Sequence, residues 1–201
     1  MSSGEFVFIV DSDFELPPNL IEDCVMACET GFDCARIHEV FVGVNYWSRC
    51  RALEQRTYWG DDVIEVPRFM RRKTYDAVAG FDETLTAGED YDFGQKLASK
   101  TLRIYTSRFI IRHHETGDLR TIVMKKHFYG KTMDAYLRKH GDSTLRDFAL
   151  VRLGWIRQRN LLINDPLHAC GIFVIKWLQY TASLIGFAQA TVGHLFSRRE
   201  S

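Results

Sequence analysis

The chain has 201 residues, 46% of them hydrophobic and 13% aromatic, which excludes a disordered protein and allows one domain with a core plus an appendage. The formal net charge is zero, yet residues 1–98 carry 9 Lys and Arg against 19 Asp and Glu, and residues 99–201 carry 17 against 7. Either the halves simply neutralise each other, or an acidic half holds a metal ion and a basic half faces phosphates or an anionic membrane.

The first part of the chain predicts strands and helices in alternation, as in an α/β fold. An apolar run rich in Val, Ile and Phe at residues 5–11 predicts a central strand, and the double proline at 17–18 opens a helix over about 19–29. The elements predicted next are a strand at 33–43, a helix at 45–60, a short strand or loop at 66–72 and a helical turn at 73–81 closed by Gly80.

An acid-rich loop then leads into a helix, in which Phe93 and Leu97 are spaced to form a buried stripe. A strand region at 101–115 ends in two histidines, and a helix at 119–141 follows. The basic residues of that helix are Arg120, Lys125, Lys126, Lys131, Arg138 and Lys139. Such a run is either a solvated face or a surface for phosphate or lipid headgroups.

The C-terminal segment changes in composition, because residues 177–197 contain no Lys, Arg, Asp or Glu. This length is sufficient to span a bilayer. Two glutamines, His194 and two glycines lower its hydrophobicity, which favours an interfacial or packed amphipathic segment, with a single membrane-spanning helix or an oligomer contact as the alternatives. We therefore predict three regions, at residues 1–118, 119–164 and 165–201.

Five cysteines, an odd number without a Cys-x-x-Cys pair, predict reduced thiols in the cytoplasm, and no secretory signal precedes the first predicted strand. Cys24, Cys28, Cys34 and His38 form a possible zinc-ligand set by residue type. Cys24 and Cys28, however, are four residues apart on the apolar face of the first predicted helix, which favours packing in the core over zinc binding.

Asp11 and Asp13 end the first predicted strand with one residue between them, so we expect their side chains to point the same way and to need a positive group nearby. A hard cation such as Mg²⁺ or Mn²⁺ prefers carboxylate oxygens and can bridge a protein to a diphosphate. The alternative is that Asp11 caps the turn and Asp13 is merely solvated.

Two further sites carry candidate chemistry. Glu89 and Asp90 begin a helix after a Thr-Ala-Gly segment, so they either complement the helix dipole or supply a general base for an acceptor hydroxyl. His113 and His114 follow a strand, where one of them either completes a metal shell with the two aspartates or is an ordinary packing residue.

The order and spacing of these features are more specific than any one of them. "VDSD", "RFMRRKTYDAVAGFDETLTAGEDYDFGQKL" and "HHE" followed by "KKHFYG" resemble the later half of a GT-A family 2 glycosyltransferase, over about residues 4–140. The resemblance implies a partial GT-A domain, an α/β fold with a Rossmann-like, mostly parallel sheet and flanking helices, followed by a helical C-terminal region.

The resemblance also implies roles. Asp11 and Asp13 would hold Mn²⁺ or Mg²⁺ on the diphosphate of a nucleotide-sugar donor, Arg68 would contribute to binding that donor, and Asp90, with Glu89 beside it, would be the catalytic base. The third metal ligand would be His113, or alternatively His114.

His113 is preferred because the family often has His-x-Glu at this point, and Glu115 fits that pattern. The reaction would be an inverting displacement at the anomeric carbon, without a covalent enzyme intermediate. "WIRQR" at 155–159 departs from the Gln-x-x-Arg-Trp element of processive members, so we expect transfer of a single sugar.

The expected acceptor is a glycan or a lipid-linked molecule such as a polyprenyl phosphate, and nucleic acid is not an expected partner. The basic half and apolar tail would hold the protein peripherally at the inner, cytoplasmic face of the cell membrane.

In the family, strands that bind the nucleotide precede the Asp-x-Asp strand, whereas here that strand begins within a few residues of Met1. We therefore expect a truncated, acceptor-side half that is poorly stable or dependent on a partner. Its alternative functions are a non-catalytic remnant or a membrane-associated interaction subunit. A metal-dependent phosphotransferase fits less well, because it leaves "GFDETLTAGED" unexplained.

Overall fold

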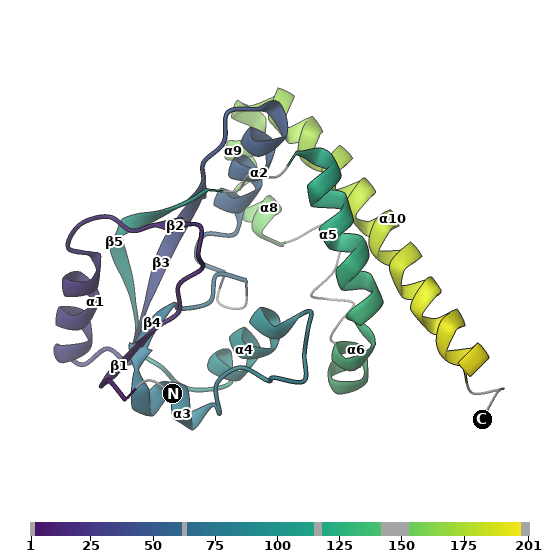
Figure 1. The fold of residues 1–201 in the computed structure, drawn as a ribbon. Helices are drawn as coiled ribbons and strands as arrows, with labels where there is room; N and C mark the ends of the chain where they lie inside the picture. The colour runs from purple at the N-terminus through teal and green to yellow at the C-terminus, as the bar shows by residue number, and fades with distance from the viewer. Residues whose placement is uncertain (1–2, 62–63, 115–117, 142–152, 198–201) are drawn as a thin grey trace.

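The structure, a computed structural model, describes residues 3–61, 64–114, 118–141 and 153–197. The chain is an α/β protein with a five-stranded mixed sheet and a helical C-terminal part. Helix α1 (Leu20–Glu29) lies on one side of the sheet, and α4 (Glu89–Ala98) and α5 (Leu119–Thr132) lie toward the other (Figure 1).

The strands are arranged in the order β1-β4-β3-β5-β2. Their bounds are Phe6–Phe8 for β1, Phe69–Arg71 for β4, Cys34–Phe41 for β3, Ile104–His113 for β5 and Phe14–Glu15 for β2. Among the described strand pairs, β3–β5 alone is parallel, and the β1–β4, β3–β4 and β2–β5 pairs are antiparallel.

The expectation of a mostly parallel sheet with the first strand at its centre was therefore wrong. A parallel pair needs a crossover that returns the chain to the start of the next strand. Helix α2 (Tyr46–Thr57) lies beyond the carboxyl end of β3 and does not make such a return (Figure 1). The chain enters β4 from the same end, so β4 pairs antiparallel with both neighbours. Among the described strands, β1 pairs with β4 alone and lies at an edge.

Helix α1 begins one residue after the position that the double proline predicts, and its apolar face packs on the sheet. Cys24 and Cys28 are fully buried in one core with Ile37 of β3 and Ile111 of β5, as their spacing predicts. Burial raises the pKa of Cys24 to about 12, so its thiol stays protonated at physiological pH.

The remaining helices follow the predicted order, but one predicted helix is two helices in the structure. Helix α3 (Arg72–Ala77) is followed by Gly80, whose φ of 60° and N–H bond to the Tyr75 carbonyl, 3.1 Å, close the turn. The helix predicted at 119–141 is divided into α5 and α6 (Asp134–His140). The C-terminal helices are α8 (Leu153–Arg157), α9 (Arg159–Asn164) and α10 (Pro166–Ser197).

Helices α5 and α10 run side by side over much of their length (Figure 1). Two glycines make this approach possible, because a Cβ atom on Gly130 would lie 2.1 Å from the Ser183 carbonyl oxygen, and one on Gly186 would lie 2.2 Å from the His127 carbonyl oxygen. A second core, containing Cys50 of α2 and Ile175 of α10, joins these helices to α2. The junction of α2, α5 and α10 is therefore tightly packed.

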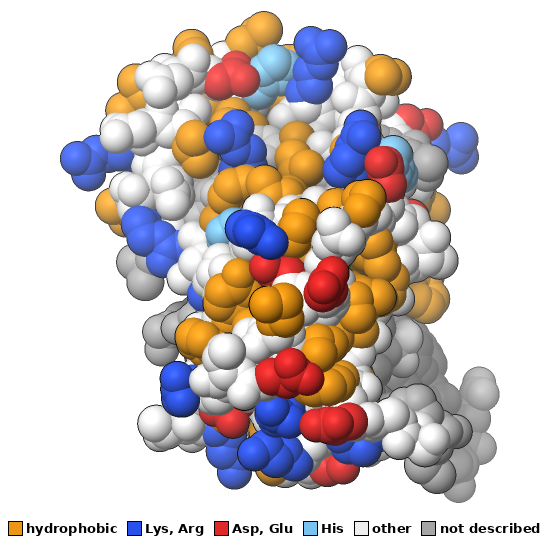
Figure 2. All heavy atoms as spheres, turned by 90° about the vertical axis from the view of Figure 1, so that its left-hand side faces the viewer, with side chains coloured by type: hydrophobic (Ala, Val, Ile, Leu, Met, Phe, Trp, Pro, Cys, Tyr) orange, Lys and Arg blue, Asp and Glu red, His pale blue; other side chains and the backbone are white. Residues whose placement is uncertain are grey.

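Helix α10 has, over Pro166–Val192, the length and composition to cross a membrane, with a mean hydropathy of 1.3. The core helices of soluble proteins pass the same test, and 33% of its most apolar window is buried here. Trp177 and Leu184 are exposed on this helix, whereas Gln179 is buried. On the α1 side of the molecule, in contrast, charges of both signs are mixed with hydrophobic side chains (Figure 2).

Candidate functional site

The two aspartates lie in a turn between β1 and β2, and not on a strand as the alternation argument assumed, because β1 already ends at Phe8. The turn is closed by the Phe14 N–H, which donates to the Asp11 carbonyl at 3.2 Å. The His114 N–H donates to the Asp13 carbonyl at 2.9 Å, which ties the turn to the end of β5.

Five charged or titratable side chains meet at this end of the sheet, and we call them the sheet-end cluster. They are Asp11 and Asp13 of the turn, Glu39 of β3, His113 of β5 and Arg68, the residue before β4. Arg68 pairs with Asp11 (Nη2 to Oδ2, 3.3 Å) and makes a short contact with Glu39. His113 pairs with Asp13 (Nε2 to Oδ2, 3.2 Å) and faces Glu39 (Nδ1 to Oε2, 3.5 Å). Each aspartate therefore has a basic partner, in line with the expectation from its charge.

Glu39 links the two halves of the sheet-end cluster. Burial of Glu39 would raise its pKa, but the contact with His113 and the charge and hydrogen bond of Arg68 outweigh this effect and hold the pKa below its usual value. Packing fixes both partners, since Arg68 lies over the Phe14 ring at 4.7 Å and the His113 ring packs against Phe41 at 4.6 Å. The carboxylate of Glu39 thus stays ionised and orients Arg68 and His113.

The structure distinguishes the two histidines by position. His113 lies beside Asp13, whereas the exposed His114 side chain pairs with Glu15 (Nε2 to Oε2, 2.6 Å). His113 is therefore the better placed of the two predicted metal ligands. Glu115, the other part of the predicted pattern, lies outside the described residues.

The sheet-end cluster has the donor types that suit Mn²⁺ or Mg²⁺. The Asp11 and Asp13 side chains are 50% and 46% exposed, so their oxygens are accessible. Within the described part of the chain, no three His, Cys, Asp or Glu side chains are grouped closely enough to hold a metal by themselves. Mg²⁺ characteristically takes one or two carboxylates and completes its shell with substrate phosphates and water, so these residues fit a cation shared with a diphosphate.

Glu89 and Asp90 occupy the first turn of α4, after Gly88 in the left-handed conformation (φ 84°). A Cβ atom on Gly88 would lie 2.5 Å from the Tyr136 ring, so this backbone is held against α6. Burial raises the pKa of Glu89, and the neighbouring charge of Asp90 adds to the shift. The two acids therefore start the helix at a fixed position.

Asp90 lies close enough to the sheet-end cluster for its charges to act on the carboxyl. Desolvation by the surrounding walls raises the pKa of Asp90; Arg68 opposes the shift, and Asp11 and Glu39 add to it. The side chain of Asp90 nevertheless remains exposed to solvent. A carboxylate that is accessible and has a raised pKa is suited to accept a proton.

A first cavity of about 290 Å³ lies between the sheet end and α2, α4, α5 and α10. Glu39, Arg68 and Asp90 line one part of it. The other part is lined by Arg51, Glu54, Lys126 and Lys176, which we call the helix-junction cluster. A substrate in this cavity would lie beside Asp90 and within reach of both clusters.

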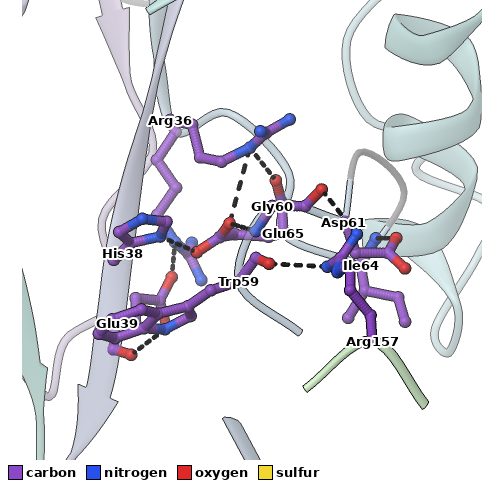
Figure 3. A network of polar contacts seen from close by, with 10 residues as sticks. Arg36, His38, Glu39, Trp59, Gly60, Asp61, Ile64, Glu65 and Arg157 are labelled. Atoms are coloured by element: carbon purple, nitrogen blue, oxygen red, sulfur yellow. Dashed lines mark hydrogen bonds and ion pairs between the residues drawn. The ribbon is translucent and has the colours of Figure 1, made fainter. Parts of the chain in front are cut away.

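A hydrogen-bond network supports the wall of the first cavity (Figure 3). Glu65 accepts from the Gly60 N–H at 2.6 Å and pairs with His38 Nδ1 at 2.5 Å. Trp59 stacks on the His38 ring at 4.4 Å, and its Nε1 donates to the Glu39 carbonyl at 3.0 Å. The network therefore fixes β3 at the residue that holds Arg68.

The sequence analysis missed Glu39 and, apart from Lys126 in the basic helix, the members of the helix-junction cluster. An acid inside the buried strand 33–43 is costly unless it is paired, so Glu39 did carry a signal of a buried partner. Arg51, Lys126 and Lys176 come from three helices, and no local pattern connects them.

No protein-family model matches the chain, and the comparison with curated proteins finds no relative. The assignment of a function therefore depends on the residues and the geometry described above.

Proposed function

We propose that this chain carries the acceptor-side part of a GT-A family 2 type glycosyltransferase site. It would transfer a sugar with inversion from a nucleotide-diphosphate donor to a hydroxyl or phosphate of a glycan or lipid-linked acceptor. The observation that carries the proposal is the meeting of Asp11, Arg68 and Asp90, from three separate segments, at one end of the sheet beside an open cavity. The motif order in the sequence supports the same reaction.

In this proposal, Asp11 and Asp13 would hold Mn²⁺ or Mg²⁺ for the donor diphosphate, with His113 beside Asp13. A bound cation of this kind neutralises the charge that develops on a departing diphosphate. Arg68 places a fixed positive charge next to Asp11 and so adds to the attraction for the diphosphate.

Asp90 accepts the proton of an acceptor hydroxyl, and its raised pKa makes it a stronger base than an ordinary aspartate. The new bond forms between the acceptor oxygen and the anomeric carbon as the bond to the diphosphate breaks. A phosphate acceptor would depend less on deprotonation by Asp90, because a phosphate monoester with a second pKa near 6 is already largely ionised at neutral pH.

We also propose that the protein lies on the cytoplasmic face of a membrane. Helix α10 exposes Phe173, Trp177 and Leu184, which suits insertion among headgroups. Its packing on α5 and the Lys176–Glu54 pair favour this arrangement over a spanning helix, because a spanning α10 would leave that pair in hydrocarbon. Recovery of the whole protein in the soluble fraction at low salt, without detergent, would contradict this proposal.

Calorimetry with UDP and GDP, with and without Mn²⁺, tests the donor site. We expect binding that requires the metal and is lost in Asp13→Ala. Asp76→Ala on α3, which removes the same charge from an exposed position, is the matched control and should bind like the wild type. If folded protein binds neither nucleotide, or binds equally well without Asp13, the proposal fails and a non-catalytic role takes its place.

A further inference from the structure

A second cavity of about 270 Å³ adjoins the first, between the start of α4, α5 and α10. Asp90, Tyr91 and the three cations Arg51, Lys126 and Lys176 line both cavities. Among the described residues, the two cavities differ in their balance of positive and negative side chains. The first cavity has four cations, Arg51, Arg68, Lys126 and Lys176, against Glu39, Glu54, Glu65 and Asp90. The second has Arg51, Lys125, Lys126 and Lys176 against Glu89 and Asp90 alone.

The cations of the second cavity repel one another, and burial further disfavours the charge of Lys126. Burial, together with the charges of Lys176 and Arg51, lowers the pKa of Lys126 to about 8, although Glu54 opposes the shift. Glu54 is already engaged, because it pairs closely with Lys176 and accepts a hydrogen bond from the Tyr58 hydroxyl at 2.5 Å. The cluster therefore retains a positive surplus, which an anion would neutralise.

A buried donor points to the same kind of ligand. Gln179 of α10 lines the second cavity and is only 3% exposed. Its Nε2 has no hydrogen-bond partner among the described residues. Burying an amide N–H without an acceptor is unfavourable, and a ligand oxygen in the second cavity would supply that acceptor.

We propose that Arg51, Lys126, Lys176 and Gln179 form a binding site for a phosphate group. Arginine offers a planar fork of donors, lysine a compact charge, and the amide a neutral donor, which together suit the several oxygens of a phosphate. A carboxylate ligand would present only two oxygens to these donors and less charge.

The position of the site assigns this phosphate to the acceptor, a step that does rest on the proposed function. Asp90 lines the second cavity, whereas Asp11 and Asp13 of the proposed donor site do not. Met124 and Phe128, on the same helix as Lys126, are exposed apolar side chains. A phosphate carried by a lipid could therefore place its headgroup in the cavity and its chain along α5.

Binding of inorganic phosphate to the full chain, without metal or nucleotide, tests the site by phosphorus NMR titration. We expect Lys126→Met to weaken binding by about tenfold or more. Lys131→Met removes the same charge from an exposed position of α5 outside both cavities and should bind like the wild type. Gln179→Leu, which leaves every charge in place, should weaken binding severalfold, and circular dichroism verifies that each variant is folded.

Equal affinity in the wild type, Lys126→Met and Gln179→Leu, or no binding by folded wild type, would overturn the inference. The Asp13→Ala variant should still bind phosphate, so a failure of the donor site and a failure of this site are separate results. Phosphatidylcholine vesicles with and without a polyprenyl monophosphate identify the source of the phosphate. Lys126-dependent binding to the phosphate-bearing vesicles supports a lipid acceptor, and phosphate binding without vesicle binding supports a soluble one.

Discussion

The sheet-end cluster and the helix-junction cluster both bring charged side chains from distant parts of the chain together, but the ratio of acids to bases differs between them. In the sheet-end cluster each acid faces a base, from Asp11 through Arg68, Glu39 and His113 to Asp13. In the helix-junction cluster three cations surround the single carboxylate Glu54. The sheet-end cluster has three carboxylates against Arg68 and His113, whereas an anion would complete the helix-junction cluster in the proposed phosphate site. In the proposed function, the sheet-end cluster orients groups for the reaction and the helix-junction cluster binds a charged part of the acceptor.

Asp90 stands between the two clusters, so its removal should have the largest effect on the reaction. We expect Asp90→Asn to lower sugar transfer by about 10²–10⁴-fold, because the acceptor hydroxyl loses its base. Nucleotide binding should persist, since Asp90 is not among the proposed donor ligands. Release of UDP from UDP-sugars with water as acceptor measures the effect, and unchanged turnover would remove Asp90 from the mechanism.

Glu54 tests how much the helix-junction cluster depends on its one acid. Glu54→Gln should destabilise the protein by roughly 3 kcal/mol at neutral pH, because Lys176 loses a buried counter-ion. Urea unfolding measures the loss, and Glu83→Gln, at an exposed position, is the control.

The pH dependence of the same variant sharpens this test. Lys176 and Arg51 overcome the effect of burial and lower the pKa of Glu54 to about 2, from a usual value of 4.5. A lowered acid pKa gives stability that is present above about pH 4.5 and is lost as the pH falls toward 2. The wild type should therefore lose stability more steeply than Glu54→Gln over that window, and parallel curves would contradict the pairing.

Gly88 tests whether α6 holds the start of α4 near Asp90. Gly88→Ala should cost about 1–3 kcal/mol of stability, since the new Cβ meets both the left-handed backbone and the Tyr136 ring. Gly60→Ala separates the two causes, because Gly60 has a similar φ of 77° but, among the described residues, its Cβ would approach only the Arg157 guanidinium, at 3.9 Å. Equal losses of melting temperature in the two variants would mean that the ring contact contributes nothing.

Lys126 should give the smallest effect on stability, and one of the opposite sign. Lys126→Met should raise stability at pH 7 by on the order of 1 kcal/mol. The reason is that the substitution removes a partly buried positive charge that Lys176 and Arg51 repel. The folded pKa, about 8, lies below the usual 10.5, so the unfolded state binds more protons between these values and wild-type stability rises with pH there. The advantage of the variant should shrink toward pH 10.5, and a constant difference would contradict the low pKa.

Much of the fold was predictable from local sequence. The double proline located α1, strands were predicted at the positions of β3 and β5, and Phe93 and Leu97 indeed form the buried stripe of α4. The direction of β4 was not predictable, because strand propensity is the same for parallel and antiparallel pairing. The β1 strand likewise has the composition of a central strand, yet it lies at an edge of the described sheet.

The candidate site was likewise predictable from the sequence only in part. The sequence by itself determined which acids were unusual, namely Asp11, Asp13 and Asp90, and showed that basic and apolar residues gather in the second half. Only the tertiary structure decided that Arg68 neutralises Asp11 and that Arg51, Lys126 and Lys176 share a cavity. The physical reason is that local periodicity records which face of an element is buried, whereas charge pairing depends on contacts between residues far apart in the chain, which packing alone brings together.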